Sequence, residues 1–320
     1  MRRVLLGPRV VDRFSRYFQV LYAPPLLACL VSLIAVAHGW LYLEHGLGGA
    51  VIDVLLQPGL ILAAGALFVV TTIFHEFGHA AALRYGGGRV RGIGAGVYLI
   101  YPVFFSDTTD AYRLGRWARV RIDIGGFYFQ SIAAVALIGL AALSGSEWLL
   151  IPVLMINLET VRQLLFPFVR LDGYWLFADL TGIPDLFSQL KPFLRSLFPR
   201  RSTSGPRLPA LKPLPRIVFF SWMIVSVPVL AVLLVQFAMH SPQWIATAWS
   251  SIAALKDGLL NAVAAGDVAG ASASLAQLLI LTMPALASIV LSLVLSTWLA
   301  SVIWRRRRAA TVTRLAPASR

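Results

Sequence analysis

Residues 58–83 read PGLILAAGALFVVTTIFHEFGHAAAL, an apolar run whose last third contains two histidines and a glutamate. About 20 apolar helical residues suffice to cross the hydrocarbon core of a bilayer, which is about 30 Å thick. Five more runs of similar character lie at 20–43, 122–144, 148–170, 217–239 and 275–303. The six runs predict an all-α polytopic membrane protein with about six transmembrane helices.

The composition supports this class. Of 320 residues, 58% are hydrophobic and only 13% are charged, whereas soluble domains have about 25% charged residues. This balance excludes a disordered chain and argues against an ordinary soluble domain. The single cysteine, Cys29, excludes a disulfide framework and a cysteine-rich zinc site.

The basic residues indicate the orientation. The formal net charge is +14, and all basic residues except Arg162 and Lys256 fall in four segments: the N-terminal arm, the loop after the second run, the stretch after the fourth run and the C-terminal tail. Six alternating spans place these segments on one side, which the positive-inside rule assigns to the cytoplasm. We therefore expect both termini to be cytoplasmic, and we expect no nucleic-acid partner.

The same pattern divides the chain into segments. We expect a basic cytoplasmic arm at 1–19, a membrane core with the metal motifs at 20–190, a basic cytoplasmic linker at 191–216, a C-terminal helix pair at 217–303 and a basic cytoplasmic tail at 304–320. Within the helix pair, the Ala-, Ser- and Gly-rich stretch 240–274 is expected to be an external loop or an amphipathic helix.

A glycine-rich stretch follows the second run. Gly86–Gly88 and three further glycines precede the β-branched and aromatic residues of 97–105. This pattern predicts a short β-hairpin or re-entrant segment. Non-helical backbone persists at membrane depth only where protein covers it or where it lines a cavity.

The polar residues of the second run form the motif H-E-x-x-H, with His75, Glu76 and His79. Four-residue spacing puts both imidazoles on one helix face, where they can bind one Zn²⁺, and Glu76 can serve as general base. The alternative is a polar cluster that packs helices without metal. His75 lies 17 residues after Pro58, or about 26 Å along a helix, so the motif is expected within the membrane toward its cytoplasmic face.

A catalytic zinc site needs a third protein ligand and an open position. The acidic candidates near the spans are Asp123, Glu159, Asp172 and Asp179. Asp172 is favoured because Pro167 breaks the preceding helix and Gly173 permits a bend back toward the bundle. The alternative for Asp172 is a helix cap or an interfacial residue.

The motif His75–Ala80, followed by Leu171-Asp172-Gly173-Tyr174-Trp175, resembles the site-2 protease family of intramembrane zinc metallopeptidases, and within it the bacterial peptide zinc metalloproteases. The segments 105–112 and 173–186 also match that pattern. The resemblance implies His75, His79 and Asp172 as ligands of one Zn²⁺ per chain, Glu76 as catalytic base, and hydrolysis of a peptide bond in or at the membrane.

The sequence departs from the family in two respects. Phe166-Pro167 stands where relatives often have Asn-Pro, so an amide that would bind substrate or the oxyanion is missing; Asn157 lies more than two turns away as a poor substitute. No PDZ-like domain is apparent. Catalysis remains the prediction, whereas the choice of substrate is left open.

Four other residues are candidates for substrate binding or for supporting the ligands. They are Asp107 and Asp110, either of which could bond the second nitrogen of a ligand histidine, together with Asn157 and Gly94. Asp107 and Asp110 could instead be turn or cap residues. Gly94 could be an ordinary turn residue or part of an edge strand that pairs with an unwound substrate.

We therefore expect a zinc metalloendopeptidase that acts on a membrane-embedded or membrane-associated peptide or protein. The alternatives are a transporter, export or immunity component without hydrolytic activity, and a zinc-binding pseudo-protease that serves as a scaffold. The lipid bilayer is an expected partner. We expect the chain in the inner (cell) membrane of a bacterium, with the active site toward the cytoplasm because of the basic segments and the depth of the motif.

Overall fold

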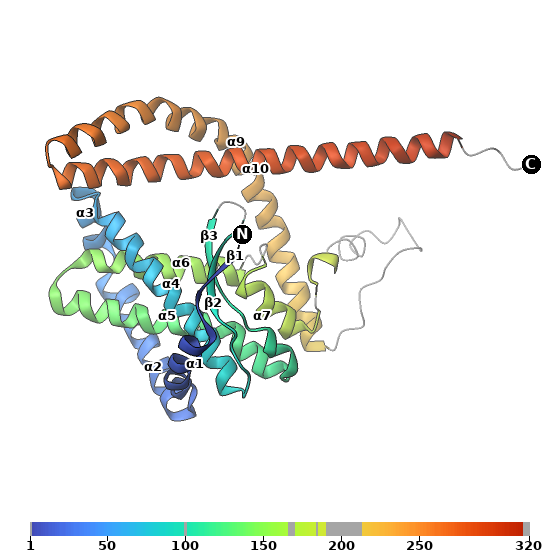
Figure 1. Ribbon diagram of the computed structural model, residues 1–320, viewed down its shortest axis with the longest axis horizontal. Helices are drawn as coiled ribbons and strands as arrows, with labels where there is room; N and C mark the ends of the chain where they lie inside the picture. Colours follow the sequence, from blue (N-terminus) through green and yellow to red (C-terminus); the bar gives the residue numbers. More distant parts are fainter. Residues whose placement is uncertain (1, 99–100, 166–169, 184, 190–212, 316–320) are drawn as a thin grey trace, which may run out of the picture. The chain divides into compact units, whose positions relative to one another are not determined.

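The structure of the chain is a computed structural model that describes residues 2–98, 101–165, 170–183, 185–189 and 213–315 (Figure 1). It is mostly helical and contains a small sheet. The chain divides into two compact units, Met1–Ala231 and Val232–Arg320. All the residues of the predicted metal motifs belong to the first unit.

In the part of the chain that the structure describes, six helical segments are long and apolar enough to cross a membrane, which agrees with the prediction of about six spans. They are α2 with η2 (Pro24–Trp40 and Leu41–His45), α4 (Leu60–Tyr85), α5 (Arg116–Ser144), η4 with α6 (Glu147–Leu149 and Leu150–Leu165), and the apolar parts of α9 (Pro213–Ala264) and α10 (Val268–Leu315).

The ends of the spans differ from those of the predicted runs, and α5 is an example with a clear physical reason. Helix α5 begins at Arg116, after Gly115 as N-cap, whereas the apolar run begins at 122. Hydropathy marks only the apolar part of a helix. Arginine is a good helix former, so the basic turns before Ile122 are helical without adding to the apolar run.

Helices α4 and α5 pack closely because each carries a glycine where they meet. A Cβ atom on Gly78 would lie 2.1 Å from the carbonyl oxygen of Gly125, and one on Gly125 would lie 2.8 Å from the carbonyl oxygen of Gly78. Tyr22 donates a buried hydrogen bond of 3.0 Å to that Gly78 oxygen, worth about 1 kcal/mol. Small residues at helix interfaces permit this approach in membranes. It brings polar groups of α5 beside the α4 histidines.

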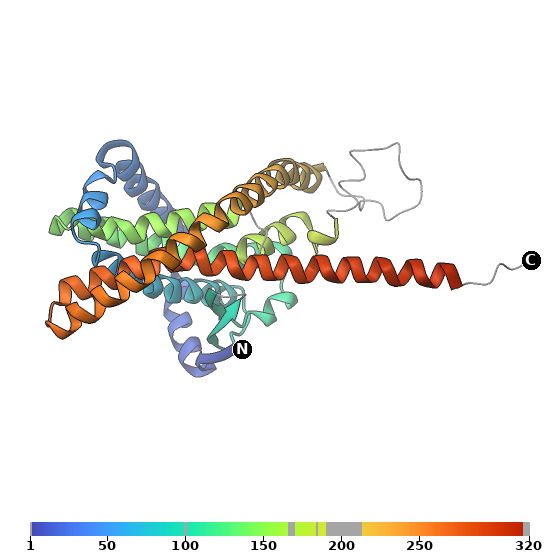
Figure 2. The ribbon, with the colours of Figure 1, turned by 90° about the horizontal axis from the view of Figure 1, so that it is seen from above.

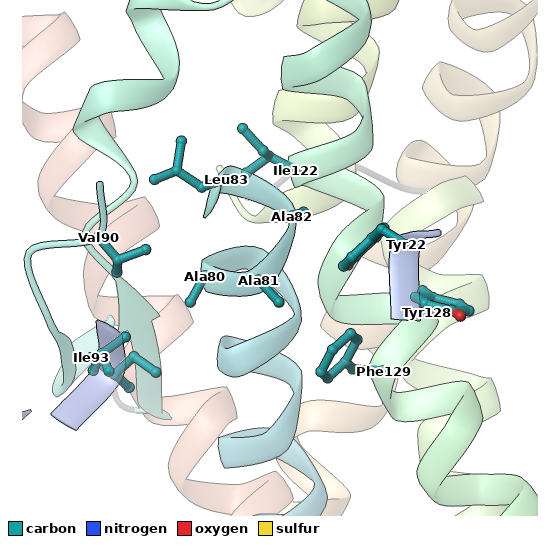
Figure 3. Close-up of a cluster of buried hydrophobic side chains, with 11 residues drawn as sticks. Tyr22, Ala80, Ala81, Ala82, Leu83, Val90, Ile93, Ile122, Tyr128 and Phe129 are labelled. Atoms are coloured by element: carbon teal, nitrogen blue, oxygen red, sulfur yellow. The ribbon is translucent and has the colours of Figure 1, made fainter. Parts of the chain in front are cut away.

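A buried cluster holds the end of α4 between the sheet and α5. The segment Ala80–Leu83 is fully buried. Figure 3 shows Val90 and Ile93 on one side of this segment and Tyr22, Tyr128 and Phe129 on the other. Burial of this apolar surface, worth about 25 cal/mol per Å², fixes the end of α4. It thereby fixes the position of the histidine motif, which directly precedes the buried segment.

The small sheet has three antiparallel strands in the order β1 (Arg2–Leu6), β2 (Ile93–Tyr98) and β3 (Tyr101–Ser106). Strands β2 and β3 pair from Ile93 with Ser106 to Tyr98 with Tyr101. Strand β1 comes from the N-terminal arm, for which the sequence predicted no strand. It pairs on the other side of β2, so β2 is the middle strand.

Shorter elements complete the first unit. They are α1 (Pro8–Phe18), η1 (Gln19–Tyr22), α3 (Gly48–Leu56), η3 (Thr109–Arg113), α7 (Asp172–Thr181) and η5 (Phe187–Gln189). Helix α5 is in contact with α4, α6 and α7 (Figures 1 and 2). It is therefore the element through which the two metal motifs can meet.

In the second unit, the helix of α9 continues through residues 240–264, for which the sequence left a loop or an amphipathic helix open. A turn at Ala265–Asp267, with Gly266 at φ 69°, leads into α10. The Asp267 carboxylate accepts a hydrogen bond of 2.9 Å from the Gly270 amide at the start of α10. Most of the linker predicted at 191–216, the Phe166-Pro167 pair and the last five residues of the predicted tail lie outside the described residues.

Candidate metal centre

The two histidines of α4 are buried and converge. His75 and His79 are each 5% exposed, and their Nε2 atoms lie 3.0 Å apart. One helical turn separates the residues, so both rings project from the same face of α4, as the four-residue spacing predicts. The two nitrogens thus share one small volume inside the helix bundle.

Hydrogen bonds from α5 fix the orientation of both rings. His79 Nδ1 lies 2.7 Å from the carbonyl oxygen of Ile122, and His75 Nδ1 lies 3.0 Å from Oε1 of Gln130. Both partners are acceptors, so each Nδ1 carries the proton and donates it. A neutral imidazole with a protonated Nδ1 presents a lone pair at Nε2. Both Nε2 atoms are therefore oriented and ready to bind a metal ion.

The carboxylate of Asp172 completes the cluster. Its Oδ2 lies 2.8 Å from His75 Nε2, and its Oδ1 lies 3.5 Å from His79 Nε2. A carboxylate oxygen this close to both nitrogens supplies a third donor atom for a metal ion. The group is therefore an anionic ligand candidate.

Asp172 is held in place by its neighbour in the chain. It is the first residue of α7, and a Cβ atom on Gly173 would lie 2.1 Å from the carbonyl oxygen of Gln163. The Gly173 amide also donates to Oε1 of Gln163 at 3.3 Å. Only glycine permits this contact between α7 and α6, and the contact aims the adjacent carboxylate at the histidines.

These three side chains form a group that could hold a metal ion. One ligand atom from each of His75, His79 and Asp172 lies within 4.8 Å of the others. Two imidazoles and a carboxylate, with a fourth position left open, are the donor set of catalytic zinc sites. The residues present thus fit a zinc ion in the chemistry and number of their donor atoms and in the hydrogen bonds that orient both imidazoles.

Gly126 leaves the space that the His75 ring occupies. A Cβ atom at this position would lie 2.2, 2.4 and 2.5 Å from the Nε2, Cε1 and Cδ2 atoms of His75. Since Gly78 and Gly125 already bring the two helices together, α5 cannot carry a side chain at position 126 without displacing a candidate ligand.

Glu76 is buried next to this group, and Ser106 at the end of β3 contacts it. The Ser106 hydroxyl lies 2.8 Å from Oε2 of Glu76 and 2.8 Å from the Glu76 carbonyl oxygen. A hydroxyl has one proton, so it donates to one of these acceptors at a time. Glu76 is within electrostatic range of His75, His79 and Asp172. The small sheet therefore contributes a polar group to the carboxylate that the sequence predicts as the base.

The partners predicted for the histidines are not those observed. Asp107 accepts hydrogen bonds from the amide and hydroxyl of Thr109, and Asp110 accepts from the Arg89 amide and Arg113. Both aspartates therefore serve turns of the segment between β3 and α5. The prediction that either one supports a ligand histidine is wrong, because helix packing places α5 groups at both Nδ1 atoms.

The two remaining candidates have partners outside the cluster. Asn157 donates a hydrogen bond of 2.7 Å to the Tyr42 hydroxyl. Gly94 lies in the middle strand, where a Cβ atom would be 2.5 Å from both the Arg3 carbonyl oxygen and the Phe105 ring. The edge-strand alternative for Gly94 is therefore wrong, and its lack of a side chain serves strand packing.

Three residues of the site were not predicted: Gln130, Gly126 and Ser106. Gln130 and Gly126 lie one helical turn apart, so they share the face of α5 that meets the histidines. A buried glutamine inside an apolar run is the one available sequence signal, because it requires a polar partner.

No family model matches the chain, and neither a curated protein nor a solved structure matches it.

Proposed function

We propose that the chain is an intramembrane zinc metalloprotease of the site-2 type. The proposal rests on one observation: the Nε2 atoms of His75 and His79 and the carboxylate of Asp172 converge beside the buried carboxylate of Glu76. Transport or scaffolding with a metal site would not require a carboxylate in that position, whereas hydrolysis requires a base next to the nucleophile.

Zinc suits this donor set: imidazole nitrogens are poor ligands for Mg²⁺ and Ca²⁺, and two histidines with a carboxylate hold the zinc of metallopeptidases. When bound, zinc would polarise a peptide carbonyl and make water nucleophilic near neutral pH. The two Nδ1 hydrogen bonds, to Gln130 and to the Ile122 carbonyl, hold the rings in the orientation that ligation requires.

Glu76 would act on the protons of the reaction. Its carboxylate takes the proton of the attacking water and later delivers that proton to the leaving amine. Ser106 holds one carboxylate oxygen by its hydroxyl, which leaves the other oxygen for the water. General base catalysis of this kind contributes about 10²- to 10⁴-fold in rate.

The proposed orientation follows from the charges. In this proposal the basic segments define a cytoplasmic side on which both termini lie. The histidines lie in the half of α4 that ends at Tyr85, where the basic loop after the second run begins. Water would reach the site from the cytoplasm. The substrate would be a peptide or protein embedded in, or attached to, the inner membrane of a bacterium.

The test compares three purified proteins in detergent: the wild type, Glu76→Gln and Glu44→Gln. Glu44 is an exposed glutamate of η2 and serves as the matched control. The probes are fluorescein-labelled casein, which is unfolded, and a fluorogenic transmembrane peptide. We expect zinc-dependent cleavage by the wild type and Glu44→Gln, and zinc binding without cleavage by Glu76→Gln. Cleavage that persists in Glu76→Gln or after chelation of zinc contradicts the proposal.

A further inference from the structure

Helix α1 shows three distinct faces. Val11 and Ser15 are fully buried, and Phe18 packs against the rings of Phe74 and Phe77 on α4. These residues are three or four apart, so they form the inner face of the helix. This face leaves the remaining circumference of the helix for two outward stripes.

The first outward stripe is apolar. Val10, Phe14 and Tyr17 are spaced by four and three residues, and they are 43%, 47% and 66% exposed. On a helix with 100° per residue they lie on one line. Phe14 contacts the Phe77 ring at its inner edge, but about half of each side chain faces away from the protein.

The second outward stripe is basic. Arg9, Arg13 and Arg16 have the same spacing and are all exposed. Each precedes a residue of the apolar stripe, so the two stripes lie about 100° apart around the helix axis. Lipid-surface helices place basic side chains beside an apolar face in this way, because the charged ends extend to the headgroups while the apolar face enters the acyl boundary.

Within the described part of the chain, the ion pairs leave most of the charge of the basic stripe uncompensated. Asp12, the one acidic residue of α1, forms ion pairs with Arg84 of α4 and, at 3.5 Å, with Arg16. A hollow of about 370 Å³ lies over this surface, lined by Arg9, Asp12, Arg13, Arg16 and Tyr17. A hollow with three guanidinium groups suits a phosphate group.

The position of α1 brings this surface to the membrane boundary. Phe18 is at the level of Phe74 and Phe77, within the predicted span α4, while Asp12 is paired with Arg84 near the end of that helix. The following helix of membrane-spanning length begins at Pro24, six residues after Phe18. Helix α1 therefore lies beside the last turns of a membrane helix.

We propose that the outward surface of α1 binds the headgroups of anionic phospholipids in the bilayer that the chain spans. The apolar stripe enters the acyl boundary and the basic stripe contacts phosphate groups. An acidic segment of another protein would match the charge, but it would not account for the exposed apolar stripe beside it. The proposal does not depend on the proteolytic activity.

The experiment measures lipid composition next to α1. A bimane label is placed at Val20→Cys, just after the helix, in a Cys29→Ser background. The full chain is reconstituted into phosphatidylcholine vesicles with a minority of phosphatidylglycerol, and either lipid carries dibrominated acyl chains that quench bimane. The ratio of the two quenching efficiencies reports local enrichment of the anionic lipid.

We expect clear enrichment of phosphatidylglycerol that weakens as salt increases. The triple variant Arg9→Gln, Arg13→Gln, Arg16→Gln should lose it, since each basic side chain near an anionic surface contributes about fivefold. The triple lysine variant should retain most of it, and so should Arg113→Gln, an exposed arginine outside α1.

Enrichment that persists in the triple glutamine variant overturns the proposal. A label that neither brominated lipid quenches also overturns it, because α1 would then lie away from the bilayer. Circular dichroism checks that each variant keeps its helices. Should the triple variant fail to fold, the three single glutamine variants provide the same comparison, and unchanged enrichment in all three contradicts the proposal.

Discussion

Replacing Gly126 by alanine would place a methyl group where the His75 ring lies. The added Cβ atom would be 2.2 Å from Nε2, and ordinary contact begins at 3.4 Å, so the ring or helix α5 must move by about 1.2 Å. Movement of α5 is restricted by the contact between Gly78 and Gly125 and by the Gln130 hydrogen bond. We therefore expect the ring to move.

Zinc sites tolerate deviations of about 0.2 Å in ligand distance. A displacement several times larger should reduce zinc affinity by about 100-fold or more, since loss of a supporting group alone costs about 10- to 100-fold. The assay is competition with a chromogenic chelator on purified protein. Gly139→Ala is the matched control, because it lies on α5 with no atom within 4 Å of its added Cβ. Wild-type zinc affinity in a folded Gly126→Ala protein would refute the packing argument.

Three further predictions follow from the groups around the site. Ser106→Ala should lower kcat with unchanged zinc content, because loss of the hydroxyl releases the Glu76 carboxylate. An unchanged kcat would show that Ser106 does not position that carboxylate. Gln130→Ala should weaken zinc binding about 10- to 100-fold. Gln130→Glu keeps an acceptor for His75 Nδ1, so it should bind zinc more tightly than Gln130→Ala does. Equal zinc affinities of the two variants would contradict the role of Gln130 in orienting His75. Asp185→Asn should lower the apparent melting temperature at neutral pH only. Burial would raise the pKa of Asp185, but the hydrogen bond from Tyr174 and the charge of Arg170 outweigh it and lower that pKa, so the stabilisation is present above the usual carboxyl pKa and disappears as the pH falls through the lowered value. Melting curves at neutral and acid pH test this, and a difference that grows on acidification would contradict it.

The amino-acid sequence predicts the parts of this fold that depend on local pattern. The six apolar runs define the spans because each helix satisfies its own backbone hydrogen bonds and needs only length and apolarity. Likewise, the spacing of His75 and His79 places both rings on one face by helix geometry alone. The choice of Asp172 required only a helix break and a glycine close to the end of a span.

The remainder depends on packing between distant segments. Strand β1 pairs with β2 across about 90 residues, and its short basic sequence has no alternating pattern that would reveal it. The partner of His75 is on α5 because Gly78 and Gly125 set the distance between two helices. Asp107 and Asp110 are wrong candidates because both carboxylates bond groups of their own segment, whereas α5 supplies the partners of both Nδ1 atoms.

The metal content of the purified chain tests the central claim most directly. We would measure zinc per chain in the wild type and in His79→Ala, in detergent, after adding zinc and removing the excess. The convergence of His75, His79 and Asp172 predicts about one zinc per wild-type chain and none in the variant. A well-folded wild type that retains no zinc would contradict the metal site and the proposed proteolytic function with it.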